Sequence, residues 1–417
     1  MADASYVHIR GQATEYEVAD VFREGWERYQ TQYPVTAQQA RVARDILACR
    51  TAALGGQVYE CLECGAVEFA YCSCRNRHCP KCQKFAKAQW VEAQKVWHLP
   101  IPYFHVVFTT DHGINAWVPE NRAAFYNLLF SAASETLKAF AAEVLGGELG
   151  LTAVLHTWSQ VLLGHVHLHC IVTGGALSFD GRRWVRSEAD YLFDIVAVAA
   201  AFRDRFCAGV VALAERGALA GVEVGAVKTA VAAMQAKRWE VFINPFETPA
   251  AVINYLSRYV HAVAISNYRL VAVGDGQVRF RYHDNPAGGV EKELTLTAEE
   301  FIGRFLWHIL PEKFVRVRHY GLHQSTARKR RLPQARKLLG LTPAVPSVAK
   351  LVLAVWLETL LGEGQVQRCH WCGALGTLAY RGEVTQLPRV WVWLKIVFGM
   401  LLGWAWHRAY RATPVRV

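Results

Sequence analysis

Apolar residues recur at two different periods along this chain, and the two periods predict both helices and strands. Residues 14–30 carry apolar side chains at helical spacing, so they are expected to form an amphipathic helix. The segment Thr36–Gln39 is typical of a capping box, and a second helix is expected to follow it to about Leu54. The chain should therefore begin with a short helical segment.

The middle of the chain predicts a sheet covered by helices. In order, the patterns predict a strand at 104–110, a helix at 118–145, two strands within 152–175, a helix at 189–219, a strand at 239–243 and a helix at 252–260. This order suits an antiparallel sheet with helices packed on it, which is an α+β architecture. Alternating runs between 269 and 297, divided by glycine-rich turns, predict additional hairpins.

Three histidines stand at alternate positions in the second strand of 152–175. Alternate residues of a strand point to the same side, so His165, His167 and His169 should share one face. Side chains two residues apart start roughly 7 Å from each other and can converge on one metal ion, whereas those four apart start roughly 13 Å away. The strand therefore offers one histidine pair and a neighbour, not a site made from all three.

Two tyrosines stand four residues apart in the helix predicted at 252–260. Tyr255 and Tyr259 should then lie on one helical face, with Thr248 as the N-cap. Such a pair usually packs in a hydrophobic core. Next to a His-x-His strand, however, it favours chemistry in which a metal ion polarises a phosphodiester and a tyrosine hydroxyl attacks it.

Six of the eleven cysteines lie within residues 61–82, among arginine, lysine and histidine. No signal peptide is expected, because the N-terminus lacks a basic segment followed by an apolar one. Clustered cysteines in such a chain indicate metal binding, not disulfides, and two Cys-x2-Cys pairs predict a structural zinc (Zn2+) site. A second zinc ion or a different ligand set stays open. The expected ligands are Cys61, Cys64, Cys79 and Cys82, with Cys74 and His78 as further candidates.

A formal net charge of +11 points to a polyanionic partner. Basic residues surround the cysteine pairs, and residues 304–337 hold ten basic side chains against one acidic. Aromatic residues between these charges favour a surface that follows the backbone of single-stranded nucleic acid. The candidates for DNA contact are Arg75, Arg77, Lys81, Arg316, Arg318, Arg328, Lys329, Arg330 and Arg331.

Five motifs, in this order, resemble those of the two-tyrosine HUH transposases of rolling-circle insertion sequences, the insertion-sequence-91 group. They are Cys49–Gly56, Ser73–Cys82, His167-Leu-His169, Tyr255–Tyr259 and Arg304–Pro311. The resemblance covers most of the chain and implies an HUH-type antiparallel sheet, with the histidine pair on a central strand and the tyrosine helix beside it. It implies that His167 and His169 hold magnesium or manganese (Mg2+ or Mn2+) while Tyr255 or Tyr259 attacks DNA.

The implied products are a 5′-phosphotyrosine and a free 3′-hydroxyl, so no nucleoside triphosphate is required, and the sequence has no P-loop motif. Hard cations prefer oxygen ligands, so a third ligand is expected; Gln160, His156 and His165 are the candidates. A replication initiator or relaxase would use the same chemistry. A zinc-containing DNA-binding regulator without catalysis is the alternative from another class of protein.

We expect four segments: an N-terminal helical segment, a zinc-binding module, the HUH core with a basic C-terminal part, and a tail, at 1–48, 49–98, 99–340 and 341–417. In the tail, the pair Cys369 and Cys372 is half a zinc knuckle, expected to hold no metal because no second pair follows it. The apolar run 390–406 is interpreted as a packed helix, not a membrane span. The expected partner is single-stranded DNA at the element ends and target site, in the bacterial cytoplasm.

Overall fold

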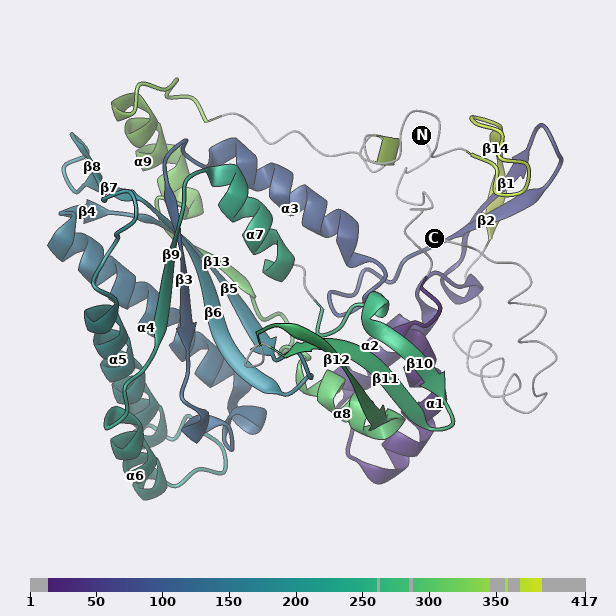
Figure 1. Cartoon of the computed structure of the whole chain (residues 1–417), viewed down its shortest axis with the longest axis horizontal. Helices are drawn as coiled ribbons and strands as arrows, with labels where there is room; N and C mark the ends of the chain where they lie inside the picture. Colours follow the sequence, from purple (N-terminus) through teal and green to yellow (C-terminus); the bar gives the residue numbers. More distant parts are fainter. Residues whose placement is uncertain (1–13, 261–262, 285–287, 346–356, 359–367, 385–417) are drawn as a thin grey trace. The chain divides into compact units, whose positions relative to one another are not determined.

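The computed structural model describes residues 14–260, 263–284, 288–345, 357–358 and 368–384 of the chain (Figure 1). Its contacts divide the chain into two compact units. We call residues 87–262 and 304–349 the central unit, and residues 1–86, 263–303 and 350–417 the cysteine unit. Residues 263–303, which the sequence analysis assigned to the core, therefore belong with the N-terminal helices.

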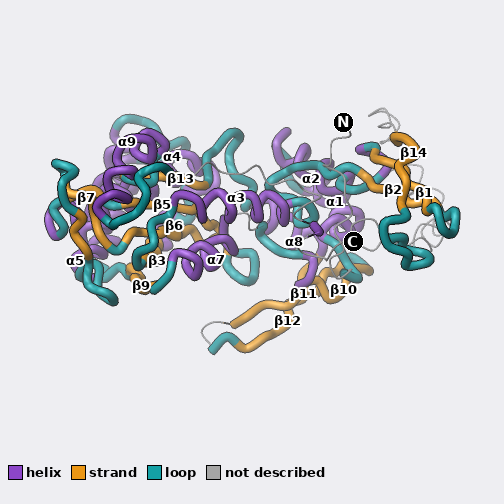
Figure 2. Tube along the Cα trace, turned by 90° about the horizontal axis from the view of Figure 1, so that it is seen from above, coloured by secondary structure: helices purple, strands orange, loops and turns teal. Residues whose placement is uncertain are grey.

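The central unit is built on a five-stranded sheet in the order β13-β5-β6-β3-β9, seen along its strands in Figure 2. Every neighbouring pair in it is antiparallel. The strands are β3 (Tyr103–Thr109), β5 (Gly150–Trp158), β6 (Gly164–Thr173), β9 (Val241–Phe246) and β13 (Val317–Gly321). The predicted α+β class is confirmed, and the histidine-rich strand β6 lies in the middle of the sheet.

Two layers of helices cover the two faces of this sheet (Figure 1). One layer contains α4 (Val118–Val144), α5 (Ile195–Glu215) and α6 (Val224–Gln235). This layer covers a large apolar core to which Leu155, Leu168 and Phe202 belong. The other layer contains α3 (Gln83–Trp97), α7 (Pro249–Val260) and α9 (Ser325–Leu338). This layer packs on Tyr103 and Ile171, and we call the sheet face beneath it the α7 face.

Several elements of this unit were not predicted, including α3, α6, α9 and β13. Helix α6 follows α5 after a turn, and α5 itself begins at Ile195, because the Asp194 carboxylate accepts a hydrogen bond from the Ala197 amide at 2.7 Å. Strand β13 adds an edge strand from the basic segment. A short sheet of β4 (Gly147–Glu148), β7 (Gly175–Ser178) and β8 (Trp184–Arg186) completes the unit.

The cysteine unit begins with α1 (Val18–Gln32) and α2 (Ala37–Ala48). The predicted capping box is confirmed, since Thr36 and Gln39 exchange backbone-to-side-chain hydrogen bonds. Helix α2 ends at Ala48 instead of near Leu54, because Cys49 already has extended backbone angles. Next to these helices lies a three-stranded sheet of β10 (Leu270–Gly274), β11 (Gln277–Asp284) and β12 (Val290–Thr297). The first residues of helix α8 (Ala298–Trp307) follow this sheet in the chain.

The described part of the tail joins the start of the cysteine unit. Strand β14 (Leu378–Val384) pairs with β1 (Gly56–Cys61), which pairs in turn with β2 (Val67–Tyr71). The apolar run at 390–406 lies outside the described residues. Among the residues that are described, no helix is both long and apolar enough to cross a membrane.

Candidate active site

Three histidine side chains meet on the α7 face of the central sheet. His156 on β5 lies directly opposite His167 on β6 in the strand register, and His169 follows two residues later on the same face. One ring nitrogen from each lies within 4.8 Å of the other two. His156 Nδ1 and His167 Nε2 are 2.8 Å apart. Two nitrogens bound at right angles about 2.1 Å from one metal ion would be about 3.0 Å apart, so this spacing suits a shared metal.

Of the three candidates for a third ligand, His156 is the one that the structure brings together with His167 and His169. His165, the neighbour on the strand, lies outside this group, and its ring faces that of His112 at a centroid distance of 6.2 Å. Gln160, the other candidate, stands in the turn between β5 and β6. We call His156, His167 and His169 the histidine cluster.

Hydrogen bonds orient two of these imidazoles toward the cluster. His167 Nδ1 lies 3.0 Å from the His165 carbonyl oxygen, which can only accept, so Nδ1 carries the proton and Nε2 keeps its lone pair. His169 Nδ1 is 2.9 Å from Nε2 of His105, a residue of β3 that the sequence analysis did not single out. His169 Nε2 is buried and has no hydrogen-bond partner in the described structure. A buried nitrogen of this kind calls for a partner, and a metal ion would supply it.

Burial keeps these imidazoles neutral. It lowers the pKa of His167 to about 3 and that of His105 to about 4. The pKa values of His156 and His169 are also lowered, first by burial and then by the neighbouring imidazoles. Neutral imidazole is the form that binds metals, so the cluster is ready to do so at neutral pH.

His105 is expected to act as a positioning residue for His169. Replacing it with alanine removes the 2.9 Å hydrogen bond that orients the His169 ring. Outer partners of this kind are worth about 10–100-fold in metal affinity. We therefore expect a metal titration of DNA cleavage to need about 10–100 times more metal for half-maximal rate, with saturating metal restoring most activity. His105→Asn, which keeps a polar group, should lie between, and an unchanged midpoint in His105→Ala would contradict the assignment.

Helix α7 brings both predicted tyrosines to the cluster. The Thr248 hydroxyl caps the helix by accepting a hydrogen bond from the Ala251 amide at 3.2 Å, as predicted. The Tyr259 ring stacks on His169 at a centroid distance of 3.8 Å, and its hydroxyl donates to the Tyr255 hydroxyl at 3.1 Å. Tyr255 packs edge-on against His105, 4.8 Å between centroids. Two potential nucleophiles therefore stand beside a potential metal site.

The motif Arg304–Pro311 supports the turn that leads into the histidine strand. Arg304 donates to the Val161 carbonyl at 2.8 Å, and His308 Nε2 lies 2.9 Å from the Leu162 carbonyl. A Cβ on Gly164, where β6 begins, would be 2.8 Å from the Trp307 ring, so only glycine fits there. This motif thus acts on the geometry of β6 and does not enter the cluster itself.

Several predicted DNA contacts are used within the protein. Arg316 donates to the carbonyls of Leu155 and Tyr259 at 3.0 and 2.8 Å. Its charge nevertheless lies close enough to the cluster to help lower the pKa of His156 and His169. Arg318 stacks on Phe130 of α4, on the opposite face of the sheet. Arg316 therefore lies near the histidine cluster, whereas Arg318 does not.

Some basic residues of helix α9 are likewise used within the protein, whereas others are exposed. Arg331 pairs with Glu148 at 3.1 Å and donates to the Ser178 carbonyl, whereas Arg328 lies over the Trp97 ring at 4.5 Å. Lys329 and Arg330 are exposed. Lys329 and Arg330 are therefore the predicted DNA contacts of this helix whose side chains remain exposed, whereas Arg331 has a structural role.

The double variant Lys329→Ala/Arg330→Ala should bind single-stranded DNA about tenfold more weakly near 0.1 M salt. Each lost phosphate contact should also reduce the slope of log affinity against log salt by about 0.7. The measurement is a binding titration at several salt concentrations. Arg216→Ala/Lys228→Ala, two exposed basic residues of the helix layer on the other face, is the control and should change neither quantity. Equal salt slopes for the two double variants would contradict the assignment.

Eight of the eleven cysteines form two groups of four, and neither group is the predicted one. Cys49, Cys74, Cys79 and Cys82 have sulfurs within 4.8 Å of one another, and we call them the N-terminal cysteine cluster. The predicted set of Cys61, Cys64, Cys79 and Cys82 is wrong, because Cys61 and Cys64 lie instead beside Cys369 and Cys372. Cys74, a further candidate, belongs to one four-cysteine group, and His78 lies outside both groups.

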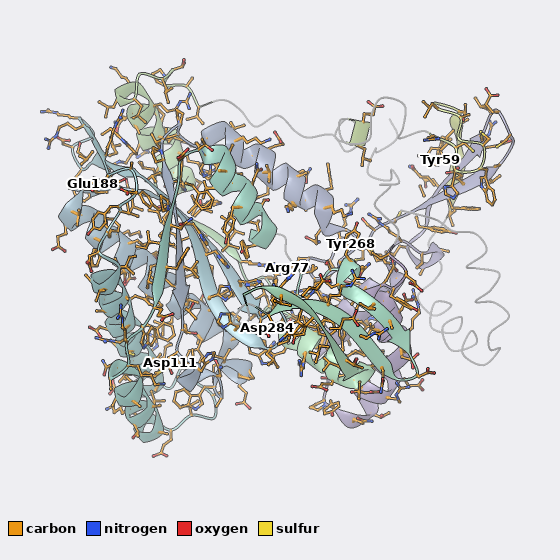
Figure 3. All side chains as sticks on the ribbon, in the orientation of Figure 1. Tyr59, Arg77, Asp111, Glu188, Tyr268 and Asp284 are labelled. Carbon is orange, nitrogen blue, oxygen red and sulfur yellow. The ribbon has the colours of Figure 1, made fainter. Side chains whose placement is uncertain are left out.

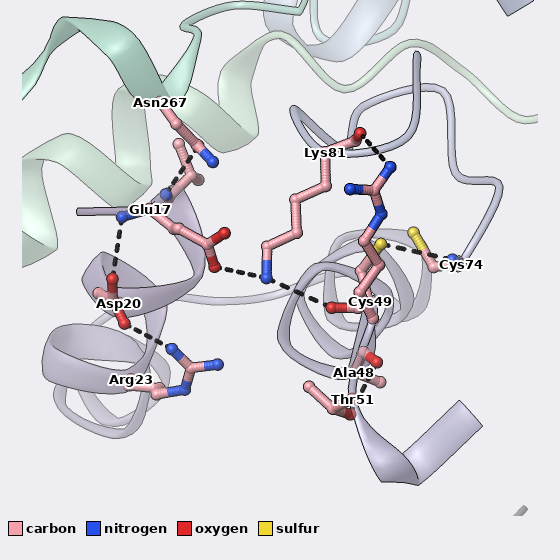
Figure 4. A network of polar contacts seen from close by, with 11 residues as sticks. Glu17, Asp20, Arg23, Ala48, Cys49, Thr51, Cys74, Lys81 and Asn267 are labelled. Carbon is pink, nitrogen blue, oxygen red and sulfur yellow. Dashed lines mark hydrogen bonds and ion pairs between the residues drawn. The ribbon is translucent and has the colours of Figure 1, made fainter. Parts of the chain in front are cut away.

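Lys81 connects the N-terminal cysteine cluster to α1 (Figure 4). Its amino group forms an ion pair with Glu17 and lies 3.3 Å from the Cys49 carbonyl oxygen. Its side chain is only 12% exposed, so it stabilises the module and is not available to a phosphate. Of the basic residues predicted here, Arg75 is exposed, while Arg77 is half-buried and burial lowers its pKa.

Comparisons with known proteins show which family this chain resembles. A family described as "Putative transposase" matches residues 150–331, and one described as "Transposase zinc-binding domain" matches residues 21–110. The putative transposase y4qJ of Sinorhizobium fredii is 42% identical over 390 residues, which cover 90% of this chain and 98% of the relative. The transposase for insertion sequence element IS801 of Pseudomonas savastanoi pv. phaseolicola is 27% identical over 82% of this chain and 83% of its own. No solved structure matches significantly.

Proposed function

We propose that this chain, which belongs to the insertion-sequence-91 family of rolling-circle transposases, cuts and joins single-stranded DNA through 5′-phosphotyrosine intermediates. Membership of the family makes the chain a DNA-processing enzyme with a zinc-binding domain. The observation that supports the finer proposal is the contact of Tyr259 with His169, at a ring distance of 3.8 Å. This contact supports the proposal because it keeps a tyrosine ring beside a histidine of a group that could hold a metal ion.

The histidine cluster would hold the divalent cation through His156, His167 and His169. Bound there, the cation would polarise the scissile phosphate and stabilise the charge that develops during an in-line displacement. Three imidazole nitrogens suit manganese better than magnesium, which prefers oxygen ligands. The DNA phosphate would supply oxygen ligands to either ion.

The tyrosine supplies the nucleophile. Its phenolic oxygen forms a bond to the phosphorus, and the bond from phosphorus to the 3′-oxygen of the preceding nucleotide breaks. The tyrosine proton is lost and the leaving 3′-oxygen gains one, so the number of phosphodiester bonds is conserved. The charge of Arg316, which stands just before β13 and helps to lower the pKa of His169, favours the approach of the phosphate.

The test uses purified protein, a divalent cation and a single-stranded oligonucleotide taken from the flanking DNA of the element. With the label on the 3′ side of the cut, we expect a labelled covalent protein–DNA band with Mn2+ or Mg2+ and none with a chelator. The same sequence as a duplex should react far less. A covalent band carrying only a 5′-side label would reverse the proposed polarity, and no band with either label would favour the non-catalytic regulator.

A further inference from the structure

We propose that Cys61, Cys64, Cys369 and Cys372 form a second zinc site, which fastens the tail of the chain to its N-terminal part. We call these residues the ribbon cluster. The family match to a zinc-binding domain ends at residue 110 and therefore contains only half of it. The inference does not depend on the proposed function, because it concerns a metal outside the histidine cluster.

The distances between the sulfurs fit a tetrahedral zinc ion. All four lie within 4.8 Å of one another, and both the Cys61–Cys372 and the Cys64–Cys369 distances are 3.7 Å. Four sulfurs about 2.3 Å from one zinc ion in a tetrahedron are about 3.8 Å apart. A disulfide would require about 2.05 Å. The cysteines are therefore placed as ligands of one ion and not as bonded pairs.

The two halves of the site share one local sequence and one local structure. Segments Cys61–Ala66 and Cys369–Ala374 both read Cys-x-x-Cys-Gly-Ala. In the first, the Cys61 amide donates to the Ala66 carbonyl at 2.8 Å and the Gly65 amide donates to the Cys61 carbonyl at 2.9 Å. The second segment repeats both bonds, at 2.8 and 3.0 Å. Equivalent turns on both sides give the ribbon cluster the form of two facing zinc knuckles.

Glycine is required where each knuckle turns back. Gly65 has φ +70° and its equivalent Gly373 has φ +76°, a region in which a side chain is strained. This conformation lets backbone amides point inward at sulfur. The amides of Glu63 and Cys64 face the Cys61 sulfur, and those two positions in the second knuckle do the same for Cys369. Amide hydrogen bonds of this kind stabilise thiolates, which are the form that binds zinc.

The strands around the site give it little other support. Strand β1 lies between β2 and β14, and the Leu62 amide donates to the Thr377 carbonyl at 2.8 Å. Tyr59, labelled in Figure 3, meets Tyr380 of β14 edge-on at 6.0 Å. Yet Tyr380 is 48% exposed and Phe69 of β2 is 39% exposed. A three-stranded sheet that buries so little apolar surface needs another source of stability, and metal ligation supplies it in small modules.

The N-terminal cysteine cluster is a separate group of possible zinc ligands, so the proposal can be tested by counting the zinc ions in each chain. It has its own four sulfurs, with Cys74 and Cys82 at 3.7 Å. The proposal therefore requires two zinc ions bound by cysteine in each chain. Cys72 stands in the sequence between Cys64 and Cys79 and belongs to neither cysteine cluster, so its replacement offers a matched control.

The first experiment measures zinc per chain in purified full-length protein by elemental analysis. It uses a His167→Ala/His169→Ala background, so that the histidine cluster contributes no zinc. We expect two zinc ions in this background and in its Cys72→Ala derivative. Cys369→Ser/Cys372→Ser and Cys61→Ser/Cys64→Ser should each retain one, and combining all four substitutions should remove no more. Two zinc ions retained in either double variant, or only one in the background protein, would overturn the proposal.

A second experiment measures the protection of the strands around the ribbon cluster instead of the zinc content. Hydrogen exchange should show protected amides in β1 and β14 of the parent protein. Both strands should lose protection together in Cys372→Ser, while α5 of the central unit stays unchanged. Cobalt added to the zinc-free parent should give the intense thiolate-to-metal absorption of a four-sulfur site, and Cys372→Ser should lose about half of it. Unchanged protection of β14 in Cys372→Ser would show that the metal does not hold the tail.

Discussion

Replacing His167 or His169 with alanine should reduce formation of the phosphotyrosine adduct at least about a thousandfold. A metal ion that stabilises the transition state contributes several kcal/mol, and about 4 kcal/mol corresponds to a thousandfold change in rate. Affinity for single-stranded DNA should change little, because it comes mainly from Lys and Arg contacts to phosphates. Adduct formation is measured at a saturating DNA concentration, and binding is measured separately.

His165→Ala is the matched control for this prediction. His165 stands on the same strand, yet its nitrogen does not belong to the histidine cluster. It should cleave DNA within about threefold of the parent. If His165→Ala were as inactive as His169→Ala, the loss would reflect the strand as a whole and not a metal site. A His167→Ala/His169→Ala double variant that forms adduct at the parent rate would remove the metal from the mechanism.

The histidine pair was predictable because its geometry is local. Two side chains at i and i+2 on a strand share a face whatever the strand pairs with. His156 was only one of three candidates, since its place opposite His167 depends on the register between β5 and β6. A shift of one residue would turn it to the other face, and the sequence does not state the register. His105, on a strand some sixty residues earlier, carried no signal of its own.

The cysteine prediction failed for a related physical reason. The spacing of a Cys-x2-Cys pair specifies a knuckle, but it does not specify which second knuckle completes the site. The partner of Cys61 and Cys64 stands about three hundred residues later, at Cys369 and Cys372. The repeated Cys-x-x-Cys-Gly-Ala pattern was the signal that could have joined them. Nearby cysteines in the sequence were chosen instead, and they belong to a different group.

The number of basic residues in a segment does not predict which of their side chains are exposed. Lys81 and Arg331 have the same charge as Arg75 and Lys329, but the first two form ion pairs inside the protein. Only the packing of α1 against the cysteine module, and of α9 against β4, decides which charges remain exposed. Strand β13 was not predicted, because its five residues lie in a basic segment that was interpreted only from its charge.

The remaining prediction concerns the two tyrosines. Tyr255 and Tyr259 share one face of α7, and their hydroxyls are 3.1 Å apart, so both can reach a phosphate at the histidine cluster in turn. Each single Tyr→Phe variant should keep its fold, because the ring still packs and only a hydroxyl is lost. We expect each single variant to form adduct with a single-junction oligonucleotide at a reduced rate, and the Tyr255→Phe/Tyr259→Phe double variant to form none.

Complete transposition should fail in both single variants, because it needs two successive attacks while the first DNA end stays attached. The alternative gives one tyrosine the chemistry and leaves the other as a packing residue against histidine. Both rings make contacts that such a role requires, Tyr255 with His105 and Tyr259 with His169. The assay is adduct formation and transposition frequency for both single variants and the double variant, with Tyr282→Phe of β11 as a control that should behave as the parent. Normal transposition by Tyr259→Phe would leave Tyr255 as the sole nucleophile, and both strand-transfer steps would then have to pass through one hydroxyl.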